Sequence, residues 1–159
     1  MRKGKKIIVI GGGAAGFFSA INCKLMNPLN QVVLLEKTGK VLSKVKVSGG
    51  GRCNVTNYCF EIGDLIRNYP RGEKELRQVF SRFAVKDTIE WFKEQGVFLK
   101  REEDNRMFPI SNTSETIVNC FLNLASKLNI QIHLKTEVIR IELKDSNTLY
   151  TNQGKYDFD

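Results

Sequence analysis

The stretch Ile7-Ile-Val-Ile-Gly-Gly-Gly-Ala-Ala-Gly16 decides the fold of this chain. Its apolar, β-branched start predicts a short buried strand, and the small and apolar residues that recur at helical spacing after the glycines predict a helix as far as Met26. Gly11, Gly13 and Gly16 form the spacing GxGxxG at the junction. The first glycine of that spacing permits a tight turn, the second lets the main chain approach a pyrophosphate, and the third lets the helix pack closely on the strand.

A second strand and an acidic residue complete a dinucleotide-binding pattern. Val32-Val-Leu-Leu35 is an uninterrupted apolar run, which is typical of a parallel strand covered on both faces. Glu36 follows it, 20 residues after Gly16, where a carboxylate can accept hydrogen bonds from the hydroxyls of a ribose. Residues 1–36 therefore predict a β-α-β unit that binds a dinucleotide, with the amides of the helix N-terminus facing the pyrophosphate.

The composition is that of an ordinary globular protein of about one domain: 159 residues, of which 42% are hydrophobic and 26% charged. The longest apolar runs are four residues long, far short of the roughly 20 that a membrane-spanning helix needs, so we expect no membrane partner. The four cysteines have no CxxC spacing, and the chain has one histidine. We therefore expect no metal site, and a cytoplasmic protein with reduced thiols.

The net charge of +8 predicts an anionic partner. Five basic residues lie between Glu36 and Asn54 without an acidic residue among them: Lys37, Lys40, Lys44, Lys46 and Arg52. We expect no nucleic-acid partner, because basic and aromatic residues do not alternate on an identifiable face. The aromatic stripe of Phe80, Phe83, Trp91 and Phe92 is typical of a core.

The remainder of the chain divides into three segments. Residues 37–72 lack periodicity and predict a long cofactor loop. Residues 73–128 predict a mainly helical segment, whose last helix opens at Asn112 with Glu115 three residues on, as in a capping box. Residues 129–159 predict one strand and a small antiparallel β-meander, with His133 on a solvent-facing side. No general acid or base can be identified, so the catalytic residues stay unknown.

A second glycine cluster distinguishes among dinucleotides. Ser48-Gly-Gly-Gly-Arg-Cys-Asn-Val-Thr-Asn57 is a dense set of main-chain and side-chain donors in a basic segment, able to surround a second polar part of a large cofactor. Together with Gly11-Gly-Gly-Ala-Ala-Gly16, Glu36-Lys37 and Arg106-Met-Phe-Pro109, it resembles the BaiN/YhiN-type bacterial FAD-dependent oxidoreductases, a family with aminoacetone-oxidase-like members. The similarity extends over nearly the whole chain.

The resemblance implies an α/β fold with a Rossmann-like FAD/NAD(P)-binding domain of the glutathione-reductase type, a parallel sheet and flanking helices. It implies that Lys37 lies near the adenosine, that the Ser48–Asn54 segment follows the cofactor towards the flavin, and that Val138 bonds the adenine through its main chain. The cofactor-binding residues expected from the motifs and from the resemblance are Gly11, Gly13, Ala14, Ala15, Gly16, Glu36, Lys37, Ser48, Gly49, Gly50, Gly51, Arg52, Cys53, Asn54 and Val138.

Members of this family are longer, with a substrate-side domain and a C-terminal return to the FAD domain. We therefore expect an N-terminal portion of a flavoenzyme that transfers hydride to or from a small organic substrate, inactive as this isolated chain, with NAD(P)H as a candidate electron donor. Two alternatives stay open: an NAD(P)-dependent dehydrogenase, and a non-catalytic dinucleotide-binding fragment. Apolar surface left exposed by truncation predicts self-association. Cys53 is interpreted as a packing residue rather than as a redox thiol.

Overall fold

The computed structural model describes residues 3–143 and 147–159. Its elements in chain order are β1 (Lys6–Ile10), α1 (Ala14–Met26), β2 (Gln31–Leu35), α2 (Ser43–Gly51), β3 (Thr56–Asn57), α3 (Ile62–Arg67), α4 (Glu73–Phe80), α5 (Val85–Glu94), β4 (Leu99–Arg101), β5 (Arg106–Pro109), α6 (Glu115–Lys127), β6 (Gln131–His133), β7 (Val138–Glu142), β8 (Asn147–Thr151) and β9 (Gly154–Phe158). They form two compact units: one runs up to Val45 and resumes at Val118, and the other is Lys46–Ile117.

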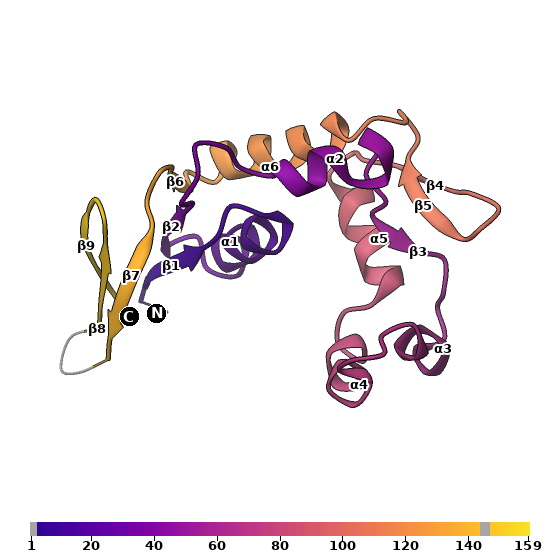
Figure 1. Cartoon of the computed structure of the whole chain (residues 1–159), viewed down its shortest axis with the longest axis horizontal. Coiled ribbons are helices and arrows are strands. Elements are labelled where there is room, and N and C mark those ends of the chain that lie inside the picture. The colour runs from indigo at the N-terminus through magenta and orange to yellow at the C-terminus, as the bar shows by residue number, and fades with distance from the viewer. Residues whose placement is uncertain (1–2, 144–146) are drawn as a thin grey trace. The chain divides into compact units, whose positions relative to one another are not determined.

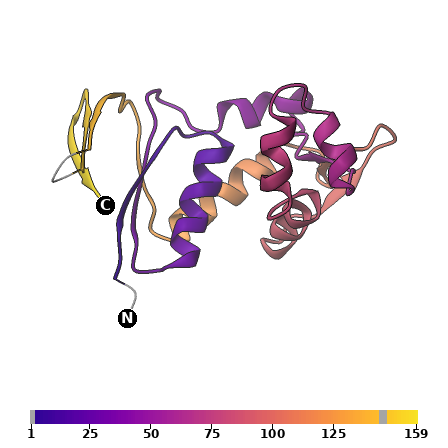
Figure 2. The ribbon, with the colours of Figure 1, turned by 90° about the horizontal axis from the view of Figure 1, so that it is seen from below.

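The first unit is built on a parallel sheet with the strand order β1-β2-β6. Ile8 pairs with Val33, and Leu34 pairs with Ile132. Helix α1 lies against β1 and β2 (Figures 1 and 2) and buries Phe17 completely. Because the two strands are parallel and α1 connects them, the structure confirms the β-α-β unit that the glycine spacing predicts.

The end of the chain forms the antiparallel sheet β7-β8-β9, which is the predicted meander (Figure 1). Its apolar face carries the fully buried Leu149. His133 was expected to face solvent, but it is half-buried, and its Nδ1 lies 2.7 Å from the hydroxyl of Tyr156 on β9. The alternating sequence of β6 could not show this contact, because β9 comes from a distant part of the chain.

The second unit combines the helices α3, α4 and α5 with the antiparallel sheet β3-β5-β4. Phe108 of β5 is completely buried, and Trp91 and Phe92 on α5 are almost completely buried. The aromatic stripe is only partly core, however, since α4 has no buried residue and Phe83 is 36% exposed.

Two local expectations were wrong. Residues 37–72 are not one irregular loop, because α2, β3 and α3 lie within them. The helical part of α2 is too short to show helical periodicity, and its main chain leaves helical geometry at Ser48, Gly49 and Gly50. Asn112 does not cap the last helix: its φ is +60°, in the left-handed region, and α6 begins three residues later at Glu115.

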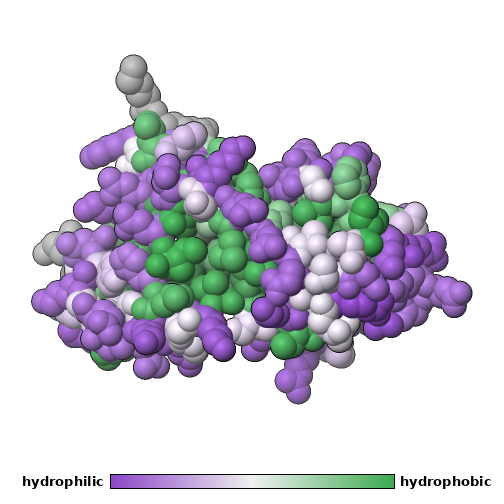
Figure 3. Space-filling model, turned by 90° about the horizontal axis from the view of Figure 1, so that it is seen from above, coloured by the Kyte–Doolittle hydropathy of each residue, from purple (hydrophilic) through white to green (hydrophobic). Residues whose placement is uncertain are grey.

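Within residues 3–143 and 147–159, no helix is both long enough and apolar enough to cross a membrane. Several large apolar side chains of the first unit are exposed, notably Met26, Leu29, Ile139 and Leu143. Figure 3 shows apolar side chains gathered in one larger area and several smaller ones among hydrophilic side chains. The expected self-association concerns such exposed surface, and it stays a prediction.

Candidate dinucleotide-binding site

The turn between β1 and α1 has a shape that only glycine permits at two places. Gly11 has a φ of +103°, which L side chains rarely adopt. A Cβ atom on Gly16 would stand 1.9 Å from the main-chain oxygen of Gly11. Both constraints bring the start of α1 close to the end of β1, as the GxGxxG spacing requires.

The N-terminus of α1 is open to a ligand. Gly13 precedes the helix without a side-chain cap, and the first turn holds no acidic residue. Gly13, Ala14 and Ala15 are exposed, and a Cβ atom on Gly13 would meet nothing within 4 Å. Uncapped amides at the positive end of a 13-residue helix suit an anion. These residues therefore fit the pyrophosphate of a dinucleotide.

Glu36 is held in place by main-chain donors. The amide of Gly12 donates to its Oε2 and the amide of Thr38 to its Oε1, both at 2.8 Å. Partial burial raises the pKa of Glu36, but the hydrogen bonds from Thr38 and Gly12 outweigh this effect and hold the pKa below its usual value. The carboxylate is thus an anion with a fixed orientation, and each oxygen keeps a lone pair for a ribose hydroxyl.

The chain before Val138 lies beside Glu36. The amide of Glu36 donates to the carbonyl of His133 at 2.9 Å, and the amide of Thr136 donates to the carbonyl of Glu36 at the same distance. Val138 follows at the start of β7, and Lys37 is exposed directly after Glu36. The structure therefore brings together, in the first unit, the glycine turn, Glu36, Lys37 and the strand start that carries Val138.

The Ser48–Asn54 loop belongs to the second unit, whereas the glycine turn belongs to the first. Gly49, Gly50 and Gly51 have φ values of +56°, +68° and +84°. A Cβ atom on Gly49 would stand 2.7 Å from Cε1 of Phe108 and 2.9 Å from the amide nitrogen of Asn54, so glycine is required there by close packing. Gly50 and Asn54 are exposed, and a Cβ atom on Gly50 would meet nothing within 4 Å.

Contacts of two residues, Ser114 and Arg52, fix this loop. The main-chain amide of Ser114 donates to the carbonyl of Gly51, and the hydroxyl of Ser114 donates to the carbonyl of Lys46, both at 2.8 Å. The guanidinium of Arg52 lies 2.5 Å from Oε1 of Glu102 and 4.0 Å from the centre of the Phe108 ring. These contacts hold the loop to Ser114, Glu102 and Phe108.

Cys53 is buried inside the same loop, with a φ of +63°. Burial raises the pKa of its thiol, and a hydrogen bond with Ser48 lowers it by less. A thiol with a raised pKa is a poor nucleophile at neutral pH. This supports the interpretation of Cys53 as a packing residue.

Sequence reasoning missed Gly12, Thr38 and Ser114. Their hydrogen bonds position Glu36 and the second glycine cluster, which are predicted to bind the cofactor. Gly12 could have been found, since it lies inside the motif. The spacing of Ser114 from the glycine cluster gave no signal, because the contact joins the start of α6 to a loop about 60 residues earlier.

Comparison with known proteins identifies the group to which this arrangement belongs. Residues 5–158 match the Rossmann domain of HI0933-like proteins. The chain belongs to the HI0933-like family. This is a family of FAD-binding Rossmann domains, so the expected fold class and cofactor are confirmed, as is the resemblance to the BaiN/YhiN-type flavoproteins.

The curated relatives of this HI0933-like chain include two enzymes. It is 30% identical over 135 residues to the ribosomal RNA dihydrouridine synthase of Escherichia coli, covering 84% of this chain and 32% of that protein. It is 26% identical over 141 residues to the 3-dehydro-bile acid delta(4,6)-reductase of Clostridium scindens, covering 87% of this chain and 34% of that protein. The chain thus spans about a third of the length of these relatives.

Among solved structures, the 3-ketosteroid-delta4-(5alpha)-dehydrogenase of Rhodococcus jostii shares the fold with a TM-score of 0.64. The two chains are 12% identical, and the match covers 98% of the HI0933-like chain and 44% of the dehydrogenase. At this identity the similarity concerns the fold alone.

Proposed function

We propose that this chain binds FAD at the β1–α1 turn and forms the cofactor-binding part of a flavin-dependent oxidoreductase. One observation carries the proposal: the uncapped N-terminus of α1 lies beside Glu36, whose carboxylate is oriented by the amides of Gly12 and Thr38. An anion site next to a fixed hydroxyl acceptor matches the pyrophosphate and ribose of an adenine dinucleotide.

Each group of residues has its own task in this proposal. The amides of Gly13, Ala14 and Ala15 stabilise the charge of the pyrophosphate, and Glu36 accepts hydrogen bonds from the ribose hydroxyls. The main chain at Val138 bonds the adenine. For the Ser48–Asn54 loop, which is open at Gly50, the family resemblance supports a role in contacting the flavin. When bound, FAD supplies hydride transfer, while the protein contributes position and electrostatics.

The two curated relatives favour a substrate class. Dihydrouridine synthesis and delta(4,6) reduction of a 3-dehydro bile acid both add hydrogen across a carbon–carbon double bond conjugated with a carbonyl group. We propose the same bond type for the whole protein of which this chain forms a part, on an organic substrate and with NAD(P)H as electron donor. No side chain of the described residues is assigned as the proton donor, so the isolated chain is proposed to be inactive.

An absorption spectrum of the purified chain, recorded before and after addition of excess FAD and desalting, tests the cofactor proposal. We expect a two-band flavin spectrum to stay with the protein, and FMN, which lacks the adenosine half, to be lost on desalting. A chain that folds by circular dichroism but retains no flavin contradicts the proposal. If NAD⁺ instead raises the thermal unfolding midpoint and FAD does not, the dehydrogenase alternative gains support.

A further inference from the structure

The positive charge of the protein is concentrated in the unit that holds the glycine turn. Residues 3–45 contain seven lysines (Lys3, Lys5, Lys6, Lys24, Lys37, Lys40 and Lys44) and one acidic residue, Glu36. The other unit, Lys46–Ile117, is almost balanced, with twelve basic and eleven acidic residues. The excess charge is therefore a property of this unit, and Lys37, Lys40 and Lys44 follow Glu36 on the side of the glycine turn, whereas Lys3, Lys5, Lys6 and Lys24 lie towards the other ends of β1 and α1.

Three of the lysines around this site, Lys40, Lys44 and Lys135, are termed the rim lysines here. The segment that carries Lys40 and Lys44 is fixed to the glycine turn by the amide of Leu42, which donates to the carbonyl of Gly12 at 2.7 Å. The amide of Lys135 donates to the carbonyl of Thr38 at 3.0 Å, which ties the third lysine to the same segment.

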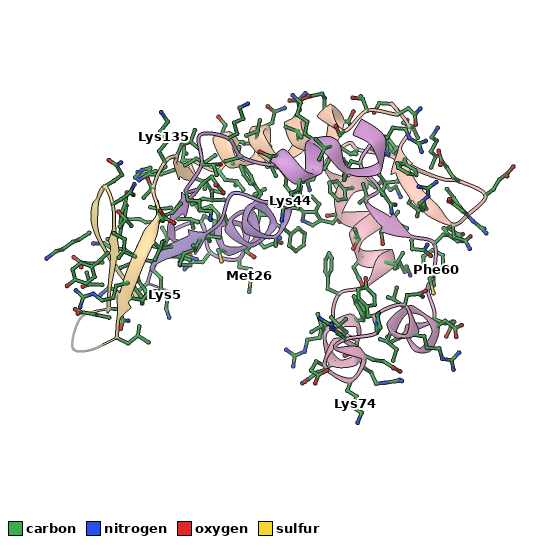
Figure 4. The ribbon with its side chains drawn as sticks, viewed as in Figure 1. Lys5, Met26, Lys44, Phe60, Lys74 and Lys135 are labelled. Carbon is green, nitrogen blue, oxygen red and sulfur yellow. The ribbon has the colours of Figure 1, made fainter. Side chains whose placement is uncertain are left out.

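The side chains of the rim lysines are free to act on an approaching ligand. All three residues are exposed, and none takes part in an ion pair among residues 3–143 and 147–159. Figure 4 shows that Lys44 and Lys135 come from different segments, α2 and the turn after β6. Glu36 precedes the segment that carries Lys40 and Lys44, and Glu137 follows Lys135; both oxygens of Glu36 already accept hydrogen bonds from amides.

We propose that the rim lysines form a capture surface that accelerates the association of FAD with the glycine turn. This inference rests on the proposed function, because it takes the pyrophosphate of FAD as the ligand. Exposed, hydrated ammonium groups make few short-range contacts that would slow dissociation, but their summed long-range field acts on an anion over about 10 Å at 0.1 M salt and so raises affinity through the association rate constant. Such fields raise association rate constants by about 10-fold or more.

Stopped-flow quenching of FAD fluorescence measures the association and dissociation rate constants separately. The test compares the wild-type chain with the triple variant Lys40→Gln/Lys44→Gln/Lys135→Gln. Lys74→Gln/Lys86→Gln/Lys127→Gln is the matched control, since it removes three exposed lysines from α4, α5 and the end of α6 and changes the net charge equally. The association rate constant of the rim variant should fall about tenfold at low salt, with an unchanged dissociation rate constant.

The difference between the rim variant and wild type should vanish at about 0.5 M salt, where the Debye length is only a few ångströms. The inference is overturned if the rim variant associates as fast as wild type, if the control slows equally, or if dissociation changes instead. Binding of FAD by wild type at high salt supports the proposed function independently of the rim. An RNA oligonucleotide that displaces FAD from wild type, but not from the rim variant, would assign the rim to a polynucleotide and overturn the inference.

Discussion

The main-chain amide of Gly12 and the carboxylate of Glu36 are joined by a hydrogen bond of 2.8 Å. This contact links the middle of the glycine turn to the acidic residue at the end of β2, so the pyrophosphate and ribose subsites of the proposed site are parts of one hydrogen-bonded structure. The carbonyl of Gly12 accepts a further hydrogen bond, from the amide of Leu42 at 2.7 Å. A change at Glu36 should therefore disturb both subsites.

Glu36→Gln should weaken FAD binding about tenfold, which corresponds to about 1.4 kcal/mol. The amide side chain can accept a hydrogen bond from only one of the amides of Gly12 and Thr38, and it points a donor at the other. Equilibrium titration of FAD fluorescence measures the change. An affinity equal to that of wild type would show that Glu36 has no part in the ribose subsite.

The same carboxylate should make stability depend on pH. Because the folded-state pKa of Glu36 lies below its unfolded value, its stabilising contribution is fully present above the unfolded pKa and is lost as the pH falls through the folded pKa. Urea unfolding of wild type and Glu36→Gln should thus show a difference in the free energy of unfolding that is largest near neutral pH and shrinks in acid. A difference that does not vary with pH would contradict this.

Two glycine substitutions should separate folding from binding. Gly16→Ala places a Cβ atom 1.9 Å from the main-chain oxygen of Gly11, and we expect it to cost about 3 kcal/mol or more. Gly13→Ala has open space around the new Cβ and a negative φ, so we expect a cost within about 1 kcal/mol and a normal fold.

If the pyrophosphate approaches Gly13, the Gly13→Ala chain should nevertheless bind FAD at least about tenfold more weakly than wild type. Chemical unfolding and flavin titration of both variants measure the two effects. A Gly13→Ala chain that binds FAD normally would move the pyrophosphate away from this turn.

The sequence was most informative where local geometry and function coincide. Gly11 and Gly16 occupy positions that only glycine can fill, and Glu36 ends a strand whose apolar run is visible without a structure, so these parts of the fold were predicted directly. By contrast, the contact of His133 with Tyr156 and the contact of Ser114 with Gly51 join segments far apart in the chain. Periodicity and spacing carry no information on such pairings.

The prediction of a loop over residues 43–51 was wrong for a different reason. The helix there covers only a few residues before Ser48, Gly49 and Gly50 leave helical geometry, so its tertiary support outweighs a local sequence that favours a loop. The placement of the Ser48–Asn54 loop along a flavin came from the family resemblance rather than from any pattern, and it stays a prediction.

The cysteines should differ in reactivity. Burial raises the pKa of Cys53, and it raises that of Cys120 to about 11, whereas Cys23 and Cys59 are only half-buried. Fewer thiolates at pH 8 and poorer access should make Cys53 and Cys120 the slower pair towards iodoacetamide. Peptide mass spectrometry over a time course measures each site. Rapid alkylation of Cys53 in the folded chain would revive the redox interpretation of this thiol.

The ion pair between Arg52 and Glu102 should support the Ser48–Asn54 loop more than an exposed pair could. The side chains of Arg52 and Glu102 are 30% and 26% exposed, and Arg52 also lies over the ring of Phe108. Arg52→Met keeps an apolar stem against the ring but leaves the Glu102 carboxylate without its partner. We expect a loss of about 1–3 kcal/mol in the free energy of unfolding.

Arg67→Met is the matched control, because the side chains of its ion pair with Asp64 are 75% and 62% exposed. Exposed pairs contribute little, so we expect a change within about 0.5 kcal/mol. If the loop also contacts the flavin, Arg52→Met should shift the absorption maxima of bound FAD, whereas Arg67→Met should leave them unchanged. Equal effects of the two variants on stability and on the flavin spectrum would show that Arg52 is an ordinary surface charge. The Ser48–Asn54 loop would then owe its shape to Ser114 and to the packing of Gly49 on Phe108.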